Sequence, residues 1–290
     1  MNKILTGDVF DRLPELPSES IHMVMTSPPY WNLRDYGVDG QLGQEDTPDE
    51  YAQNIADVVE QISRVLRDDG SLWLNIGDSY ASKPAGNAGK SSASLNGDYQ
   101  KNSGSGTIDK SEDAPEKSKL LIPQRVALEI QSRGFIIRND IVWYKPDKGI
   151  PESVTDRHTR AHEAVFHIPM SSDYIFNMDK IREPNGSIPP DVWEVKSNSD
   201  SRVSTNFARY PKELCKTPIR ATCPDNGVVL DPFAGSGTTL EAAKELGRKF
   251  IGIELNPEYA DMARARVGLD VEDPSNIRGD QSQSGLEGFQ

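Results

Sequence analysis

The chain has 290 residues, with 32 Lys and Arg against 45 Asp and Glu, so its formal net charge is −13. The length suffices for one large domain, and no run approaches the 18 apolar residues of a membrane span. The N-terminus has no apolar segment typical of a secretion signal, so we expect a cytoplasmic protein without a membrane partner.

Short apolar runs that alternate with helical patterns predict a regular succession of strands and helices. In chain order we expect strands at 21–25, 71–76, 135–144, 164–169, 172–177, 227–231 and 249–254, and helices at 48–67, 122–133, 238–246 and 257–267. This succession predicts an α/β protein with a doubly wound, mostly parallel, Rossmann-like sheet.

Three polar stretches interrupt this pattern. Residues 82–118 are rich in Ser, Gly, Lys, Asn and Asp, which predicts a flexible insert. Residues 184–206 are polar and irregular, and the acidic stretch after Gly268 predicts a disordered tail. We therefore expect a single domain over residues 1–267 and a tail over 268–290.

A glycine-containing loop joins a predicted buried strand to a predicted helix. The segment Asp231 to Thr239 reads Asp-Pro-Phe-Ala-Gly-Ser-Gly-Thr-Thr, and its glycines allow the backbone to approach a ligand at the strand end. Glu254 ends the following strand, where a carboxylate can accept hydrogen bonds from both hydroxyls of a ribose. Because Leu240 departs from the dinucleotide pattern, a nucleoside cofactor without a pyrophosphate is favoured. The alternative is an ordinary turn with a capping threonine.

A proline pair follows another predicted strand, in the segment Thr26-Ser27-Pro28-Pro29-Tyr30-Trp31. The two prolines stiffen the loop, because each fixes one backbone angle. The Ser27 hydroxyl and the Pro28 carbonyl can accept the two N–H groups of an exocyclic amine and direct its lone pair at an electrophile. Tyr30 can stack on a base that has left its duplex. The alternative is a rigid corner plugged by an aromatic ring.

Together, these segments resemble the S-adenosylmethionine-dependent amino-methyltransferases of DNA. The catalytic motif precedes the cofactor motif, an order similar to that of the circularly permuted β group. The further stretches that match the family are Gly7-Asp8, 74–80, 143–145, 160–163 with Tyr174, 207–214 and 251–259.

The resemblance implies direct methyl transfer from the sulfonium of S-adenosylmethionine to the amine of a flipped base, in a fold whose catalytic half precedes its cofactor half. It assigns Ser27, Pro28, Pro29 and Tyr30 to the base. It assigns Asp231, Phe233, Gly235, Ser236, Gly237, Thr238 and Glu254 to the cofactor, with Asp78 near the adenosine and Pro211 near the methionine part.

Cytosine N4 is the favoured acceptor, because Ser27 with a Trp after Tyr30 is the commoner pattern among cytosine enzymes of the family. Adenine N6 is the first alternative, followed by an RNA base or a protein glutamine, and a non-catalytic binding protein is the third class. Double-stranded DNA is the expected partner, with or without a cognate restriction endonuclease, and the chain acts as a monomer or a homodimer.

Target recognition is expected in the short interval 180–206, which lies within the basic middle part of the chain. Residues 117–220 carry 17 basic and 13 acidic side chains, whereas both flanks are acidic. The side chains able to read base edges there are Lys180, Arg182, Lys196, Asn198, Arg202 and Asn206. So few groups predict a recognition site of about four base pairs.

Other chemistries are disfavoured. Methylation at cytosine C5 needs a Pro-Cys dipeptide, but Cys223 precedes Pro224, and we expect Cys223 and Cys215 to be buried and inert. His158, His162 and His167 are expected to be structural, without a metal. The 26 Asp against 19 Glu suit a protein that works at high salt, which predicts a halophilic host or its virus.

Overall fold

The computed structural model describes residues 2–33, 40–81, 114–147, 155–197 and 210–270. Within these ranges, one eight-stranded sheet has the order β1-β8-β7-β2-β3-β5-β4-β6. The strands are β1 (Lys3–Thr6), β2 (Ile21–Thr26), β3 (Leu66–Ile76), β4 (Asn139–Tyr144), β5 (His162–Pro169), β6 (Val192–Glu194), β7 (Val228–Asp231) and β8 (Lys249–Glu254). The helices are α1 (Val9–Arg12), α2 (Pro48–Val65), α3 (Ile122–Ser132), α4 (Lys212–Thr222), α5 (Thr238–Glu245) and α6 (Pro257–Val267), with short 3-10 turns at η1 (Leu13–Glu15) and η2 (Met178–Lys180).

The sheet is mostly parallel, as predicted. Every neighbouring pair is parallel except for the two pairs that β5 makes, with β3 and with β4. The C-terminal ends of all strands except β5 therefore meet at one edge of the sheet, together with the start of β5. In an open α/β sheet this edge is where ligands bind.

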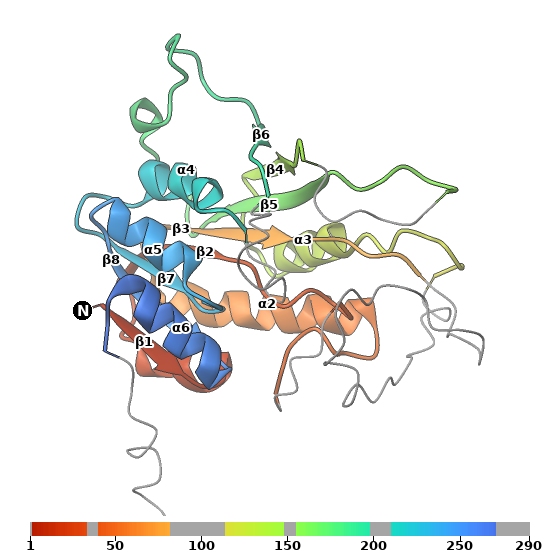
Figure 1. Ribbon diagram of the computed structural model, residues 1–290, viewed down its shortest axis with the longest axis horizontal. Coiled ribbons are helices and arrows are strands. Elements are labelled where there is room, and N and C mark those ends of the chain that lie inside the picture. Colours follow the sequence, from red (N-terminus) through yellow and green to blue (C-terminus); the bar gives the residue numbers. More distant parts are fainter. Residues whose placement is uncertain (1, 34–39, 82–113, 148–154, 198–209, 271–290) are drawn as a thin grey trace, which may run out of the picture.

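Helices cover both faces of the sheet, which confirms the doubly wound architecture (Figure 1). Helices α2 and α3 pack on one face, and α4, α5 and α6 pack on the other. The side chains of β2 alternate between the two cores: Val24 belongs to the α2 side, whereas Met23 and Met25 belong to the α4 side. Burial on both faces explains why the parallel strands are continuous apolar runs in the sequence.

The long helix α2 begins at a capping box, in which the Thr47 side chain accepts from the Glu50 amide and Glu50 accepts from the Thr47 amide. Its end differs slightly from the predicted range 48–67. The helix ends at Val65, and Gly70 lies inside β3. A side chain at Gly70 would place its Cβ 2.9 Å from the carbonyl oxygen of His22, so the glycine permits a close approach of β3 to β2.

The strand predicted at 172–177 is absent, because its backbone makes single hydrogen bonds to two separate segments and no ladder with either. The Ile175 amide donates to the Asp69 carbonyl at 2.9 Å, and the Asn177 amide donates to the Ala221 carbonyl at 2.7 Å. The apolar alternation that suggested a strand instead brings Tyr174 and Phe176 against the ring of His167.

The polar stretch 184–206 contains a strand that the sequence did not predict. Strand β6 pairs with β4, and the Trp143 indole donates to the Val195 carbonyl at 2.8 Å. Three residues among polar neighbours are too few for a periodic signal. Strand β4 begins at Asn139, four residues later than expected, and β1 and α4 were not predicted either.

Parts of the predicted domain division lie outside the described residues: 82–113 of the insert, 198–206 of the recognition interval and 271–290 of the tail. None of the described helices is long and apolar enough to cross a membrane.

Candidate active site

The two predicted loops leave the same edge of the sheet from neighbouring strands. Ser27 follows the last residue of β2, and Pro232 follows the last residue of β7, the strand beside β2. Glu254 ends β8, the next strand along. The fold therefore brings together two segments that lie about 200 residues apart in the sequence, and Figure 1 shows the red and blue parts of the chain side by side.

The proline loop is held in place by hydrogen bonds to α2 and to the chain around Gly43. Pro28 is buried, and the Tyr51 hydroxyl of α2 donates to the Pro29 carbonyl at 3.0 Å. The Asn32 amide donates to the Gly43 carbonyl at 2.7 Å, and Gly43 adopts a φ of +91°. A Cβ at Gly43 would lie 3.0 Å from the Tyr30 carbonyl oxygen, so this return of the chain against the loop requires glycine.

Tyr30 is anchored through its hydroxyl group. That hydroxyl donates to Glu163 Oε2 at 2.6 Å, lies 3.0 Å from Asn75 Oδ1, and accepts from the Ser27 hydroxyl at 3.3 Å. Burial, and next the charge of Glu163, hold the pKa of the Tyr30 phenol well above its ordinary value. The phenol therefore stays protonated and acts as a fixed donor, not as a base.

A polar network fixes Glu163 in turn. Lys145 forms an ion pair with Glu163 Oε1, and the Asn75 amide group donates to Oε2 at 3.2 Å. With Tyr30, three donors therefore converge on the two oxygens of one carboxylate. Gly77 leaves the space for the aromatic ring, because a Cβ there would lie 2.5 Å from Tyr30 Cε2.

The glycine loop turns sharply between β7 and α5. Gly235 and Gly237 have φ values of +51° and +86°, and a Cβ at Gly237 would lie 3.0 Å from that of Ala263 in α6. A Cβ at Gly235, in contrast, would meet nothing within 4 Å. Ser236 is 4% exposed, and its hydroxyl has no hydrogen-bond partner among the described residues. A buried hydroxyl without a partner beside open space fits a loop that receives a polar ligand.

Glu254 lies across the glycine loop. Its two carboxylate oxygens accept from the Gly235 amide at 2.7 Å and from the Asn256 amide at 2.9 Å. Burial raises the pKa of Glu254, although these amide hydrogen bonds lower it in part. Each oxygen keeps a second lone pair, so the carboxylate can still accept the hydroxyls of a ribose.

Asp231 is 1% exposed and lies beneath both loops. Oδ1 accepts from the Thr26 hydroxyl at 2.7 Å and from the Phe233 amide at 3.1 Å, and Oδ2 accepts from the Tyr210 hydroxyl at 3.1 Å. Burial raises the pKa of Asp231, and the hydrogen bonds oppose that rise.

The remaining predicted cofactor residues have different surroundings. Phe233 packs against the core on the α2 side, and Pro211 is buried where α4 begins. Thr238 is buried and accepts from Arg266 at 3.1 Å. Asp78 follows β3, and its Oδ1 accepts from the Ser79 and Ile122 amides, so this carboxylate caps the start of α3.

Sequence reasoning missed two contributors. Thr26 was noted only as the residue before Ser27, and Tyr51 only as part of the predicted helix 48–67. The Thr26 hydroxyl joins the two strand ends at Asp231, and the Tyr51 hydroxyl holds the proline loop. The one available signal was position, because Thr26 is the last residue of a predicted strand. Hydroxyl partners far apart in the sequence leave no local pattern.

The two cysteines and His167 are buried in the interior of the protein. Cys215 and Cys223 are buried and unpaired by disulfide, as expected. His167 is fully buried, stacks on Trp73 with ring centroids 4.2 Å apart, and lies 3.1 Å from the Ser71 hydroxyl. Within the described ranges, no group of three His, Cys, Asp or Glu residues could hold a metal ion.

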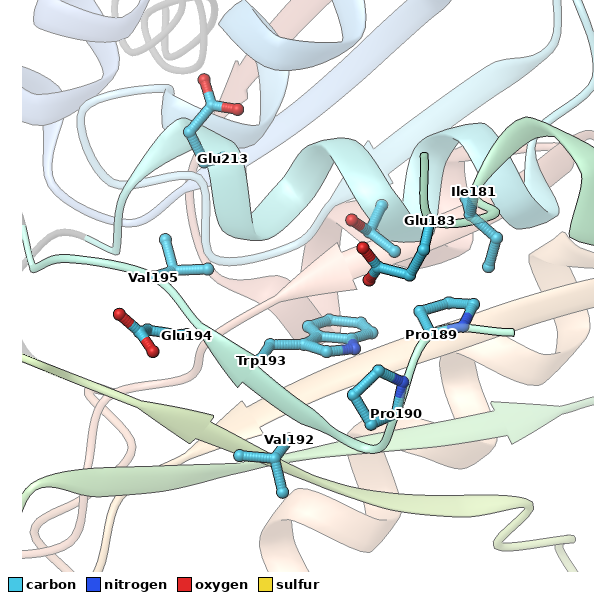
Figure 2. Close-up of a pocket in the computed structure, with 10 residues that line it drawn as sticks. Ile181, Glu183, Pro189, Pro190, Val192, Trp193, Glu194, Val195 and Glu213 are labelled. Carbon is cyan, nitrogen blue, oxygen red and sulfur yellow. The ribbon is translucent and has the colours of Figure 1, made fainter. Parts of the chain in front are cut away.

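A separate cavity of about 350 Å³ lies between β6 and α4 (Figure 2). Trp193 lies at its centre, and Glu183, Glu194 and Glu213 are the acidic residues that line it. None of the predicted catalytic or cofactor residues lines this cavity, and most of its lining residues belong to the predicted recognition interval 180–206.

The fold defines a class of protein: a Rossmann-like α/β protein in which a glycine loop after β7 lies beside a proline loop after β2. The family model for DNA methylases of the N6/N4 type matches residues 21–265. The chain belongs to this family and is a DNA amino-methyltransferase.

Relatives and solved structures agree. The chain is 38% identical over 271 residues to the Type II methyltransferase M.SmaI of Serratia marcescens. The aligned region covers 91% of this chain and 90% of that protein. It is 39% identical over 283 residues to the Type II methyltransferase M.Cfr9I of Citrobacter freundii, and the aligned region covers 95% of this chain and 90% of that protein.

Solved structures share the fold at lower identity. The cytosine-N4-specific PvuII DNA methyltransferase has a TM-score of 0.68 at 23% identity, over 96% of this chain and 90% of that one. A putative DNA modification methylase of Thermus thermophilus in complex with S-adenosyl-L-methionine has a TM-score of 0.63 at 23% identity, over 92% and 93%.

Proposed function

We propose that the enzyme transfers a methyl group from S-adenosylmethionine to cytosine N4 in double-stranded DNA, with the catalytic half before the cofactor half as in the circularly permuted β group. The observation that carries this proposal is the junction of β2 and β7, where the Thr26 hydroxyl binds Asp231. Red β2 precedes blue β7 along the chain in Figure 1, which supports the permuted order.

The glycine loop and Glu254 fit the cofactor. The open space over Gly235 and the unpaired Ser236 hydroxyl lie beside the carboxylate that would hold the ribose. Bound there, S-adenosylmethionine supplies an electrophilic methyl group on a sulfonium. The residues proposed to contact the cofactor are Phe233, Gly235, Ser236, Gly237, Thr238 and Glu254, with Pro211 and Asp78 at the margins of the site. Asp231 supports the glycine loop from beneath. Asp78 differs from the rest, because one of its oxygens already caps α3.

The residues of the proline loop prepare the amine. The Ser27 hydroxyl and the Pro28 carbonyl accept its two N–H groups, which localises the lone pair on nitrogen. Tyr30, fixed by Glu163, offers a ring on which the flipped base stacks. The new N–C bond forms as the S–C bond breaks, and the nitrogen loses one proton to solvent. Catalysis thus rests on position and hydrogen bonding, without a covalent enzyme intermediate.

Nucleoside mass spectrometry of DNA methylated by the purified enzyme tests the acceptor. We expect N4-methylcytosine, and N6-methyladenine would establish the first alternative instead. Labelled methyl groups offered with DNA, RNA and protein distinguish a DNA enzyme from one that acts on RNA or on glutamine.

A pair of variants tests the catalytic loop. Ser27→Ala together with Pro28→Ala should lower methyl incorporation into DNA by about two orders of magnitude, a usual loss for misplaced reacting groups. Ser63→Ala, on the exposed surface of α2, is the matched control and should leave the rate unchanged. An unaltered rate in the double variant contradicts the assignment of this loop.

The biological setting follows from the relatives, which are described as Type II methyltransferases. A partnership with a restriction endonuclease of the same specificity is the proposal they support. Recognition is assigned to residues 180–206 and to a site of about four base pairs, because few side chains there can reach base edges. Single-molecule sequencing of modified DNA tests this, and a motif of six or more specified bases would contradict it.

A further inference from the structure

The strand ends that carry the two proposed loops are joined by a buried hydrogen bond. Thr26 and Asp231 end the adjacent parallel strands β2 and β7, and each is 1% exposed. The Thr26 hydroxyl donates to Asp231 Oδ1 at 2.7 Å. The residues that follow these two in the chain begin the proline loop and the glycine loop.

A second set of contacts crosses the same junction. The Thr239 hydroxyl in the first turn of α5 donates to the Met25 carbonyl of β2 at 3.3 Å. The Tyr210 hydroxyl donates to Asp231 Oδ2 at 3.1 Å and also contacts the Thr239 hydroxyl. The last two residues of β2 are therefore tied to the segment that carries the glycine loop at both Asp231 and Thr239.

Protein donors already occupy both oxygens of the Asp231 carboxylate. Its Oδ1 accepts from Thr26 and from the Phe233 amide, and its Oδ2 accepts from Tyr210. A carboxylate this buried, with three protein donors, is built to hold its neighbours in place and not to face a ligand.

We infer that Asp231 is a positioning residue, which with Thr26 and Tyr210 forms a clamp that fixes the distance between the proline loop and the glycine loop. The inference rests on the proposed function and gives Asp231 a task other than direct contact with the cofactor. Methyl transfer requires the donor and acceptor atoms in line at close range, so a small relative shift of the two loops slows the reaction strongly. The clamp sets that geometry before either substrate binds.

The test is Thr26→Val, which removes the hydroxyl but keeps the shape of the side chain and its suitability for a strand. We expect the single-turnover rate of methyl transfer to fall at least about tenfold, because small displacements of reacting groups have effects of this size. The dissociation constants for S-adenosylmethionine and for DNA, measured by titration calorimetry and by fluorescence anisotropy, should stay near those of the wild type. Thr26→Ser restores the hydroxyl and should restore the rate.

Thr222→Val is the matched control. Thr222 is also buried, donates to the Pro218 carbonyl at 2.9 Å and accepts from the Trp73 indole at 3.0 Å, but it holds neither loop. Its loss should leave the rate of methyl transfer unchanged. Tyr210→Phe removes the other side-chain tie to Asp231 and serves as the second variant if Thr26→Val does not fold.

The possible outcomes separate clearly. An unchanged rate in Thr26→Val, or in Tyr210→Phe where that variant is used, overturns the clamp. The clamp is also overturned if the dissociation constant for S-adenosylmethionine rises by the same factor as the rate falls, because the side chains would then act by binding the cofactor. Ser27→Ala distinguishes the two proposals: if it keeps the wild-type rate, the proposed function fails, whereas a slow Ser27→Ala with a fast Thr26→Val overturns the clamp alone.

Discussion

Tyr30 shows how single residues are fixed at the proposed site. Its ring fills the space that Gly77 leaves, and its hydroxyl donates to the Glu163 carboxylate. Glu163 has Lys145 at one oxygen and two donors, Tyr30 and Asn75, at the other. Only a carboxylate can accept from donors on both sides, since an amide would turn its own N–H groups toward one of them.

A double-mutant cycle tests this anchor. Tyr30→Phe keeps the ring but removes the hydroxyl, and kcat/KM should fall about tenfold, close to the worth of a hydrogen bond to a charged group. Glu163→Gln should cause at least the same loss. If the two groups act through each other, the double variant loses less than the product of the single losses.

Tyr174→Phe is the control for that cycle, because it removes a hydroxyl that accepts from Arg138 at 3.1 Å outside the network. It should leave kcat/KM unchanged. Fully additive losses in the Tyr30→Phe and Glu163→Gln pair would contradict the anchoring of Tyr30 by Glu163.

Among the elements, β5 is the strand that runs antiparallel to both of its neighbours, and it carries a buried histidine. His167 stacks on Trp73 of β3, with the rings 8° from parallel. Burial, and next the charge of Arg138, lower the pKa of His167 to about 3. The ring is therefore neutral in the folded protein, whereas in the unfolded chain it titrates near its ordinary value of about 6.5.

This difference predicts how stability depends on pH. The unfolded state takes up a proton as the pH falls below about 6.5 and the folded state does not, so the stabilisation is complete above that pH. It is lost as the pH decreases toward the folded pKa of about 3, by up to about 1.4 kcal/mol per pH unit.

Urea unfolding at several pH values between 7.5 and 5 measures the effect. His167→Phe retains a ring against Trp73 but cannot titrate, so its free energy of unfolding should fall less steeply with pH than that of the wild type. The difference between the two proteins removes the contribution of carboxylates common to both. Equal slopes would show that His167 is not held neutral.

For the whole molecule, the uneven charge bears on DNA binding. The net charge is −13, yet the stretch 117–220 has a basic excess. The halophilic host remains a prediction from composition alone, because none of the relatives and solved structures described above supports it. DNA binding weakens with salt as counterions compete, whereas screening relieves the repulsion between an acidic surface and phosphates.

If the second effect dominates, the methylation rate at subsaturating DNA should peak above about 0.1 M salt, where the Debye length is shorter than about 10 Å. Rates measured across a potassium chloride series, with the free energy of unfolding followed in parallel, separate an effect on binding from one on stability. A maximum below about 0.1 M would contradict the prediction.

Much of the fold could be predicted because its signals are local. Buried parallel strands are apolar runs, and α2 carries the pattern and the capping residues of a long helix. The predictions failed where an element depends on a distant neighbour. In the segment 172–177, Tyr174 and Phe176 contact His167 without forming a strand. Strand β6 exists only because β4 lies beside it.

By itself, the sequence determined the α/β class, the two loop motifs and their order along the chain, because residue type and spacing carry those signals. The tertiary structure decided which groups meet: Tyr30 with Glu163, and Thr26 with Asp231. These partners lie 133 and 205 residues apart, and only the placement of β2 between β7 and β3 brings them within hydrogen-bond distance. Hydrogen bonds act over about 3 Å, so strand order and not sequence spacing defines the site.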